Sequence, residues 1–129
     1  MKISLQAYIK GSEEAVLFYQ RAFGTELGHN VRKPDGTFMH AELYLDKELL
    51  LAVSEADSQV GSELMKGHSA ADYPTMNFGV SLGSEEAVKR AYNILTEGGN
   101  ILLPLGPLPW NTCCANIIDK FGVFWYLCV

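Results

Sequence analysis

The sequence lacks any apolar run of the roughly 20 residues that a membrane helix needs, and its first residues contain no apolar leader segment. Basic residues are scarce, since 10 Lys and Arg stand against 15 Asp and Glu for a net charge of -5. Such a chain offers no positive patch to a phosphate backbone or an anionic lipid surface. We therefore expect a cytoplasmic protein that binds neither nucleic acid nor membrane.

Cysteine is also rare, and the three that occur are Cys113, Cys114 and Cys128. An odd number with two adjacent members does not build the disulfide framework of a secreted domain. The C-x-x-C spacing of a zinc site is missing, and adjacent residues of a strand point to opposite faces. We expect reduced cysteines that serve in packing.

The most informative feature that is present is an internal repeat. The hexapeptide Gly-Ser-Glu-Glu-Ala-Val occupies residues 11–16 and recurs 72 positions later at 83–88. Each copy follows an alternating segment of strand length, at 3–9 and 76–82. The 129 residues fit one compact domain, so we expect a single domain made of two similar modules.

Each module is predicted to fold as β-α-β-β-β. The helix follows the hexapeptide, because Ser12 and Ser84 can cap the first free N–H groups and the paired glutamates lie at the positive end of the dipole. Three strands then follow, at about 26–33, 37–45 and 48–53 in the first module and at about 100–103, 112–118 and 123–129 in the second. The modules cover about 1–54 and 75–129. Residues 55–74 are expected to form a linker or a mobile lid.

The predicted fold class is α+β, with both modules contributing to a curved, mostly antiparallel eight-stranded sheet that leaves a cavity open. Strand alternation then assigns side chains to the two sheet faces. The helix side receives Ala41, Leu43, Leu45, Phe78, Val80 and Leu82. The cavity side receives His40, Glu42, Tyr44, Asn77, Gly79 and Ser81.

Several short motifs carry a family resemblance across nearly the whole chain. They are Glu-Glu-Ala-Val-Leu-Phe-Tyr at 13–19, Met-His-Ala-Glu-Leu at 39–43, Glu-Gly-Gly at 97–99, Pro109-Trp110 and Asp-Lys-Phe-Gly-Val-Phe-Trp at 119–125. In this order they resemble the vicinal oxygen chelate superfamily, which includes glyoxalase I, extradiol dioxygenases and the bleomycin and fosfomycin resistance proteins. More narrowly, the chain looks like the PhnB-like branch.

The resemblance implies a divalent metal held by His or Gln on each module's first strand and by Glu on each last strand. Matched residue by residue, the first-strand positions hold Ser4 or Gln6 and Asn77. The last-strand positions hold Tyr126 and a residue within 50–53, Leu-Leu-Ala-Val. Since a divalent metal needs several anionic or imidazole ligands, we expect neither the family's metal nor another cofactor.

Seven residues remain as candidates for function. His40 and Glu42 lie two apart on one strand, and together they can act as general acid and base. The candidates for ligand contact are Gln6, Tyr8, Asn77, Trp110 and Trp125. The two indoles can cover an apolar or aromatic molecule. The same patterns also fit a cross-strand hydrogen-bonding pair for His-x-Glu and a core position for Trp125.

The first hypothesis is a protein that binds a small apolar or aromatic molecule in the sheet cavity without a metal. The alternative is a lyase, isomerase or dioxygenase-type enzyme of the superfamily that uses His40 and Glu42 or an unrecognised metal site. A third is a dimer with a vestigial cavity. We also expect a homodimer, because sheet edges need covering and residues 103–110 are a strongly apolar, proline-rich loop.

Overall fold

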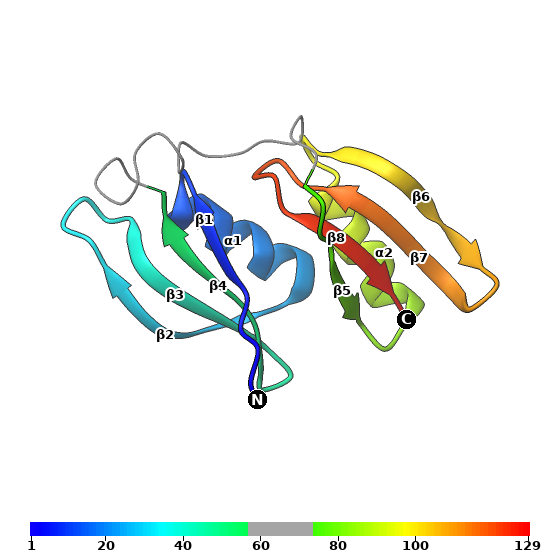
Figure 1. Ribbon diagram of the computed structural model, residues 1–129, viewed down its shortest axis with the longest axis horizontal. Helices are drawn as coiled ribbons and strands as arrows, with labels where there is room; N and C mark the ends of the chain where they lie inside the picture. Colours follow the sequence, from blue (N-terminus) through cyan, green and yellow to red (C-terminus); the bar gives the residue numbers. More distant parts are fainter. Residues whose placement is uncertain (57–73) are drawn as a thin grey trace. The chain divides into compact units, whose positions relative to one another are not determined.

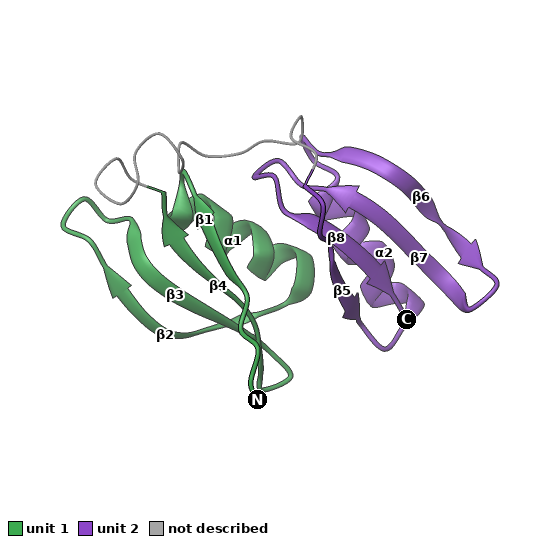
Figure 2. Cartoon of the chain, in the orientation of Figure 1, with its two compact units in different colours: residues 1–67 green, residues 68–129 purple. Residues whose placement is uncertain are grey.

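The computed structural model describes residues 1–56 and 74–129. The chain divides into two compact units, Met1–Gly67 and His68–Val129, which are coloured separately in Figure 2. In its described residues each unit has one helix and four strands in the predicted order β-α-β-β-β, so the α+β fold class is confirmed. Most of the expected linker or lid, residues 57–73, lies outside the described residues.

The eight strands form one four-stranded sheet in each unit, with the same topology (Figure 1). Unit 1 contains β1 (Gln6–Ile9), α1 (Ser12–Phe23), β2 (Glu26–Arg32), β3 (Phe38–Leu45) and β4 (Glu48–Glu55), in the sheet order β1-β4-β3-β2. Unit 2 contains β5 (Phe78–Ser81), α2 (Glu85–Leu95), β6 (Asn100–Leu108), β7 (Asn111–Ile118) and β8 (Phe124–Cys128), in the order β5-β8-β7-β6. The first strand of each unit runs parallel to the last, and the other pairs are antiparallel.

Each helix covers one face of its own sheet, and we call the opposite side the helix-free face. The helix α1 packs on β1, β3 and β4, while α2 packs on β7 and β8. Burial follows the predicted alternation. Ala41 and Leu43 have no exposed surface, whereas the alternate residues His40, Glu42 and Tyr44 are each partly exposed. In the described part of the chain neither helix is long and apolar enough to cross a membrane.

The two copies of the hexapeptide begin their helices differently. Ser84 is the N-cap of α2, and its hydroxyl accepts a hydrogen bond of 3.2 Å from the N–H of Ala87, as predicted. The prediction for Ser12 is wrong, because the N-cap of α1 is Gly11, which has no side chain that could cap the helix. Instead the Glu55 carboxylate accepts from the N–H groups of Gly11 and Ser12 at 3.0 and 2.9 Å. A carboxylate from β4 has taken the place of the expected hydroxyl.

A second correction concerns β6, which was expected to end near residue 103 and to lead into a loop. The strand continues to Leu108 and includes two exposed prolines, Pro104 and Pro107. Proline is tolerated here because β6 is the edge of its sheet, where one row of N–H groups has no partner strand. The pairing with β7 shifts register three times along the strand. The apolar segment is therefore an edge strand with bulges.

Candidate functional site

The helix-free face of unit 1 brings together four of the seven candidate residues. Gln6 and Glu42 both lie opposite Ala52 of β4, so the three share one row across the sheet. Tyr8 pairs with Ser54 one step further along, and the amide of Gln6 donates a hydrogen bond of 2.8 Å to the hydroxyl of Ser54. With His40 on the same side of β3, these side chains share one face of the sheet.

Glu42 is the centre of this surface. Its Oε2 accepts a hydrogen bond of 2.8 Å from the Tyr44 hydroxyl, and its Oε1 lies 3.4 Å from Nε2 of His40. The bond from Tyr44 is the main cause that lowers the pKa of Glu42, and the contact with His40 adds to it. The same bond raises the pKa of Tyr44. At neutral pH Glu42 is therefore an ionised acceptor whose two oxygens are already engaged.

On the helix-free face of unit 2, the described candidate side chains and their hydrogen-bond partners are neutral, and two of them are aromatic. The indole N–H of Trp110 donates a hydrogen bond of 3.0 Å to the hydroxyl of Tyr126, although 72% of Trp110 is exposed. Asn77 donates to the side-chain oxygen of Asn116 at 3.2 Å, and Asn116 lies opposite Tyr126 in the β7–β8 pair. Of the candidates, Trp110 and Asn77 therefore lie on one face of unit 2.

Trp125 takes the core position that its pattern also fits, and it does not reach this face. Its side chain is fully buried, and its indole N–H donates a hydrogen bond of 2.9 Å to the buried carboxylate of Asp119. Its ring also contacts the edge of Phe78 at a centroid distance of 6.0 Å. Trp125 is a core residue on the helix side of β8. The residue that sequence analysis missed is its neighbour Tyr126, which alternation places on the other face.

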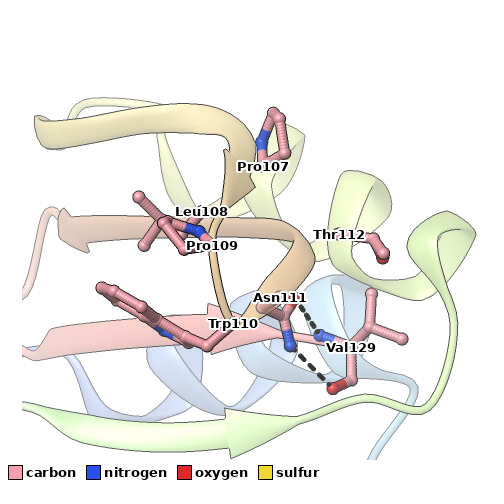
Figure 3. Close-up of a pocket in the computed structure, with 7 residues that line it drawn as sticks. All are labelled: Pro107, Leu108, Pro109, Trp110, Asn111, Thr112 and Val129. Atoms are coloured by element: carbon pink, nitrogen blue, oxygen red, sulfur yellow. Dashed lines mark hydrogen bonds between the residues drawn. The ribbon is translucent and has the colours of Figure 1, made fainter.

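A shallow pocket of about 530 Å³ lies beside Trp110, where the β6–β7 hairpin meets the end of β8 (Figure 3). Its lining consists of residues 107–112 and Val129. The side chain of Asn111 donates to the carbonyl of Val129 and accepts from its N–H, both at 3.2 Å. These two bonds, drawn as dashed lines in Figure 3, fix the hairpin that carries Trp110.

The residues at the family's ligand positions do not fit a divalent metal. Gln6, Asn77 and Tyr126 are neutral, and each is hydrogen-bonded to a neighbouring side chain. Gln6 is a ligand type that the family uses, but Asn77 is not, and Tyr126 and residues 50–53 offer no carboxylate, so these positions lack the anionic charge that such an ion requires. Across residues 1–56 and 74–129, no group of three or more His, Cys, Asp or Glu side chains is placed to hold a metal ion.

Comparison with known proteins agrees with this fold. The family model of the Glyoxalase/Bleomycin resistance protein/Dioxygenase superfamily matches residues 4–127. A PhnB protein from Bacillus cereus is 26% identical, with a TM-score of 0.76 over 99% of this chain and 98% of that one. Protein PA1353 from Pseudomonas aeruginosa is 23% identical, with a TM-score of 0.77 over 99% and 96%.

A more distant neighbour is the fosfomycin resistance protein FosX from Listeria monocytogenes, solved with Mn(II) and a sulfate ion. It is 12% identical, with a TM-score of 0.67 over 100% of this chain and 89% of that one, which is a likeness of fold alone. The sequence has no significant match among curated proteins. On the family match and the shared fold, the chain belongs to the Glyoxalase/Bleomycin resistance protein/Dioxygenase superfamily.

Proposed function

We propose that the protein binds a small apolar or aromatic molecule on the helix-free face of unit 2, with the Trp110 indole as the main contact surface. The observation that carries this proposal is that Trp110 is 72% exposed and yet held in place by its hydrogen bond to Tyr126. A large ring left in water is unfavourable, and a ring already fixed in one position loses little entropy when a ligand stacks on it. This combination is typical of a binding surface.

The polar groups around Trp110 indicate which ligands the surface accepts. Asn77, Asn116 and Tyr126 are neutral donors and acceptors. Neutral hydrogen-bonding groups beside an aromatic surface favour uncharged planar molecules with a few polar substituents. The pocket of about 530 Å³ beside Trp110 lies in the size range of small-molecule sites.

The test is a titration with N-phenyl-1-naphthylamine, an uncharged aromatic dye whose fluorescence rises in apolar surroundings. Trp110→Ala removes the contact surface and is expected to weaken binding about tenfold or more, which corresponds to ~1.4 kcal/mol. Tyr126→Phe releases the indole and is expected to weaken binding less. Tyr8→Phe, the same change on the helix-free face of unit 1, is the matched control. An unchanged dissociation constant in Trp110→Ala would contradict the proposal.

A second candidate function, acid–base catalysis by His40 and Glu42, is favoured by their contact of 3.4 Å. The superfamily's lyases, isomerases and dioxygenases make such chemistry reasonable for this fold. The geometry favours it less than binding, because the hydrogen bond from Tyr44 lowers the pKa of Glu42 and so makes it a weak base. If His40 and Glu42 catalyse a reaction, His40→Asn should abolish turnover of the substrate while leaving binding of the dye unchanged.

We also propose a homodimer that forms through the β6 edge. Among residues 74–129, the part of unit 2 that the structure describes, no strand pairs with the outer side of β6, and Ile101 of this strand is 46% exposed. An apolar edge strand exposes both unpaired backbone groups and side chains that a second copy can cover. Its two exposed prolines limit how much of that edge a second strand can pair with.

A further inference from the structure

Two cysteines lie on the neighbouring strands β7 and β8. In this antiparallel pair Ala115 lies opposite Leu127, and continuing that register by one residue would place Cys114 opposite Cys128. The carbonyl of Cys128 accepts a hydrogen bond of 2.9 Å from the N–H of Leu82, which lies beyond β5 on the far side of β8. The backbone polar groups of Cys128 therefore point away from β7. With the register extended in this way, Cys114 and Cys128 would belong to the closely spaced, non-hydrogen-bonded type of pair.

This spacing suits a disulfide. Opposite residues of the closely spaced type have Cα atoms about 4.5 Å apart, within the range of roughly 4.4–6.8 Å that disulfides span. Both thiols are on the helix-free face, since Cys114 and Cys128 have the strand parity of Asn116 and Tyr126, and Sγ of Cys128 lies 3.2 Å from the hydroxyl of Ser81. As reduced thiols they contact backbone carbonyls on either side, Cys114 at Gly106 (3.5 Å) and Cys128 at Val80 (3.6 Å).

Cys113 is the natural comparison, because it is adjacent to Cys114 in sequence and points the other way. Burial raises the pKa of the Cys113 thiol, and the nearby charge of Glu85 on α2 raises it further. Its side chain therefore faces the helix and cannot meet Cys128 across the opposite side of the sheet. The chain thus carries one matched pair and one isolated thiol.

We propose that Cys114 and Cys128 form a redox site that a peroxide closes to a disulfide, and that closure weakens ligand binding at Trp110. The second half of this proposal rests on the proposed function. Cys128 is 9% exposed and Cys114 fully buried, so Cys128 reacts first. Its thiolate attacks one peroxide oxygen, forming a sulfenic acid and releasing hydroxide, which takes up the thiol proton to become water. Cys114, deprotonated, then attacks that sulfur, and the sulfenic oxygen leaves with the proton as a second water.

Closure acts on the binding surface through Tyr126. The hydrogen bond from Trp110 lowers the pKa of Tyr126, but burial and the hydrogen bond with the Cys114 thiol outweigh it and leave that pKa raised. A disulfide removes the thiol of Cys114, so Tyr126 loses the interaction with that thiol, which acts beside the hydrogen bond from Trp110. The Trp110 indole, held by that hydroxyl, is then less well fixed. We expect the affinity for N-phenyl-1-naphthylamine to fall about threefold.

The experiment treats the reduced full chain with hydrogen peroxide, blocks remaining thiols with N-ethylmaleimide under denaturing conditions, and measures the intact mass. The reduced protein has three thiols to label. The oxidised protein should lose about 2 Da and take up a single label. Peptide mapping should then find Cys114 joined to Cys128. Three labels after prolonged oxidation would overturn the redox site.

Three matched variants complete the test, each checked for its fold by circular dichroism. Cys113→Ser should still lose about 2 Da on oxidation, whereas Cys114→Ser and Cys128→Ala should not. A disulfide that disappears in Cys113→Ser would overturn the assignment. If the disulfide forms but dye affinity does not change, regulation of the site is refuted. If neither the reduced nor the oxidised chain binds dye, the proposed function fails while the redox site stands on its mass.

Discussion

The two copies of Gly-Ser-Glu-Glu-Ala-Val share every residue and differ in how they start a helix. Ser12 is fully buried, donates its O–H to Glu55 at 2.8 Å and accepts from the N–H of Phe38 at 2.8 Å. Ser84 is exposed and caps its own helix. The difference comes from the last strand, because Ile9 pairs with Glu55 in unit 1 and the equivalent Ser81 pairs with Cys128 in unit 2. A residue 43 positions away from Ser12 decides its role.

The same contrast extends to the helix-free faces. Unit 1 presents an ionised carboxylate, Glu42, with His40 and Tyr44 engaged on it. Unit 2 presents an exposed indole, Trp110, fixed by a neutral hydroxyl. The duplicated modules have kept one topology while their surfaces have acquired different chemistry, and this difference is why we place ligand binding in unit 2.

The largest expected effect comes from removing the two caps separately. Glu55→Ala leaves two backbone N–H groups and the Ser12 hydroxyl without their acceptor, and should lower the free energy of unfolding by about 3 kcal/mol. Ser84→Ala removes one exposed cap and should cost about 1 kcal/mol. Urea denaturation followed by circular dichroism measures both. Equal losses would show that the two helix starts do not differ energetically.

The edges of the two sheets should also differ. Leu105→Asp with Leu108→Asp places two charges on β6, and we expect the dimer to dissociate to monomers near 14.2 kDa. Val31→Asp changes the edge strand β2 of unit 1, where 41% of Val31 is exposed, and should leave the mass unchanged. Sedimentation equilibrium at about 100 μM decides the matter, because a micromolar dimer is mostly associated there. A wild-type mass near 14.2 kDa would exclude the dimer.

A smaller effect is expected from acid. The pKa of Glu42 is lowered on folding, so its contribution to stability is present above the ordinary carboxyl range of about 4.3–4.5 and is lost as the pH falls through the lowered value. Tyr44→Phe removes the main cause of this shift. In that variant the Glu42 carboxyl should titrate at a higher pH in NMR spectra, whereas Tyr126→Phe in unit 2 should leave it unchanged. A Glu42 pKa that does not move would contradict the hydrogen bond.

The smallest effect is expected from divalent metal ions, which should not bind stoichiometrically. After incubation with nickel, zinc or manganese and removal of free ions, the protein should retain less than one equivalent of metal, because Gln6, Asn77 and Tyr126 are neutral and occupied. Elemental analysis measures this directly. One tightly held equivalent that is lost in His40→Ala or Glu42→Gln would refute the expectation and would indicate a metal site in unit 1.

Much of the fold follows from the sequence, because the repeat and strand alternation are local signals. These two signals were enough to predict the β-α-β-β-β order and the shared face of His40 and Glu42. The role of Glu55 at the start of α1 could not be foreseen, since it depends on which residue β4 brings to the helix. The length of β6 depends on its place at the sheet edge, where Pro104 costs no ladder hydrogen bond. Trp125 could have been placed in the core from its parity with the apolar Leu127.

The central claim is that a ligand binds on unit 2 and not on the corresponding face of unit 1. The most direct measurement is a ¹H–¹⁵N NMR titration of the labelled protein with N-phenyl-1-naphthylamine. We expect the signals of the Trp110 indole N–H and of the amides around Tyr126 to shift, while those of the buried Trp125 indole N–H and the Gln6 side-chain amide stay in place. Shifts confined to residues around His40 and Glu42 would contradict it.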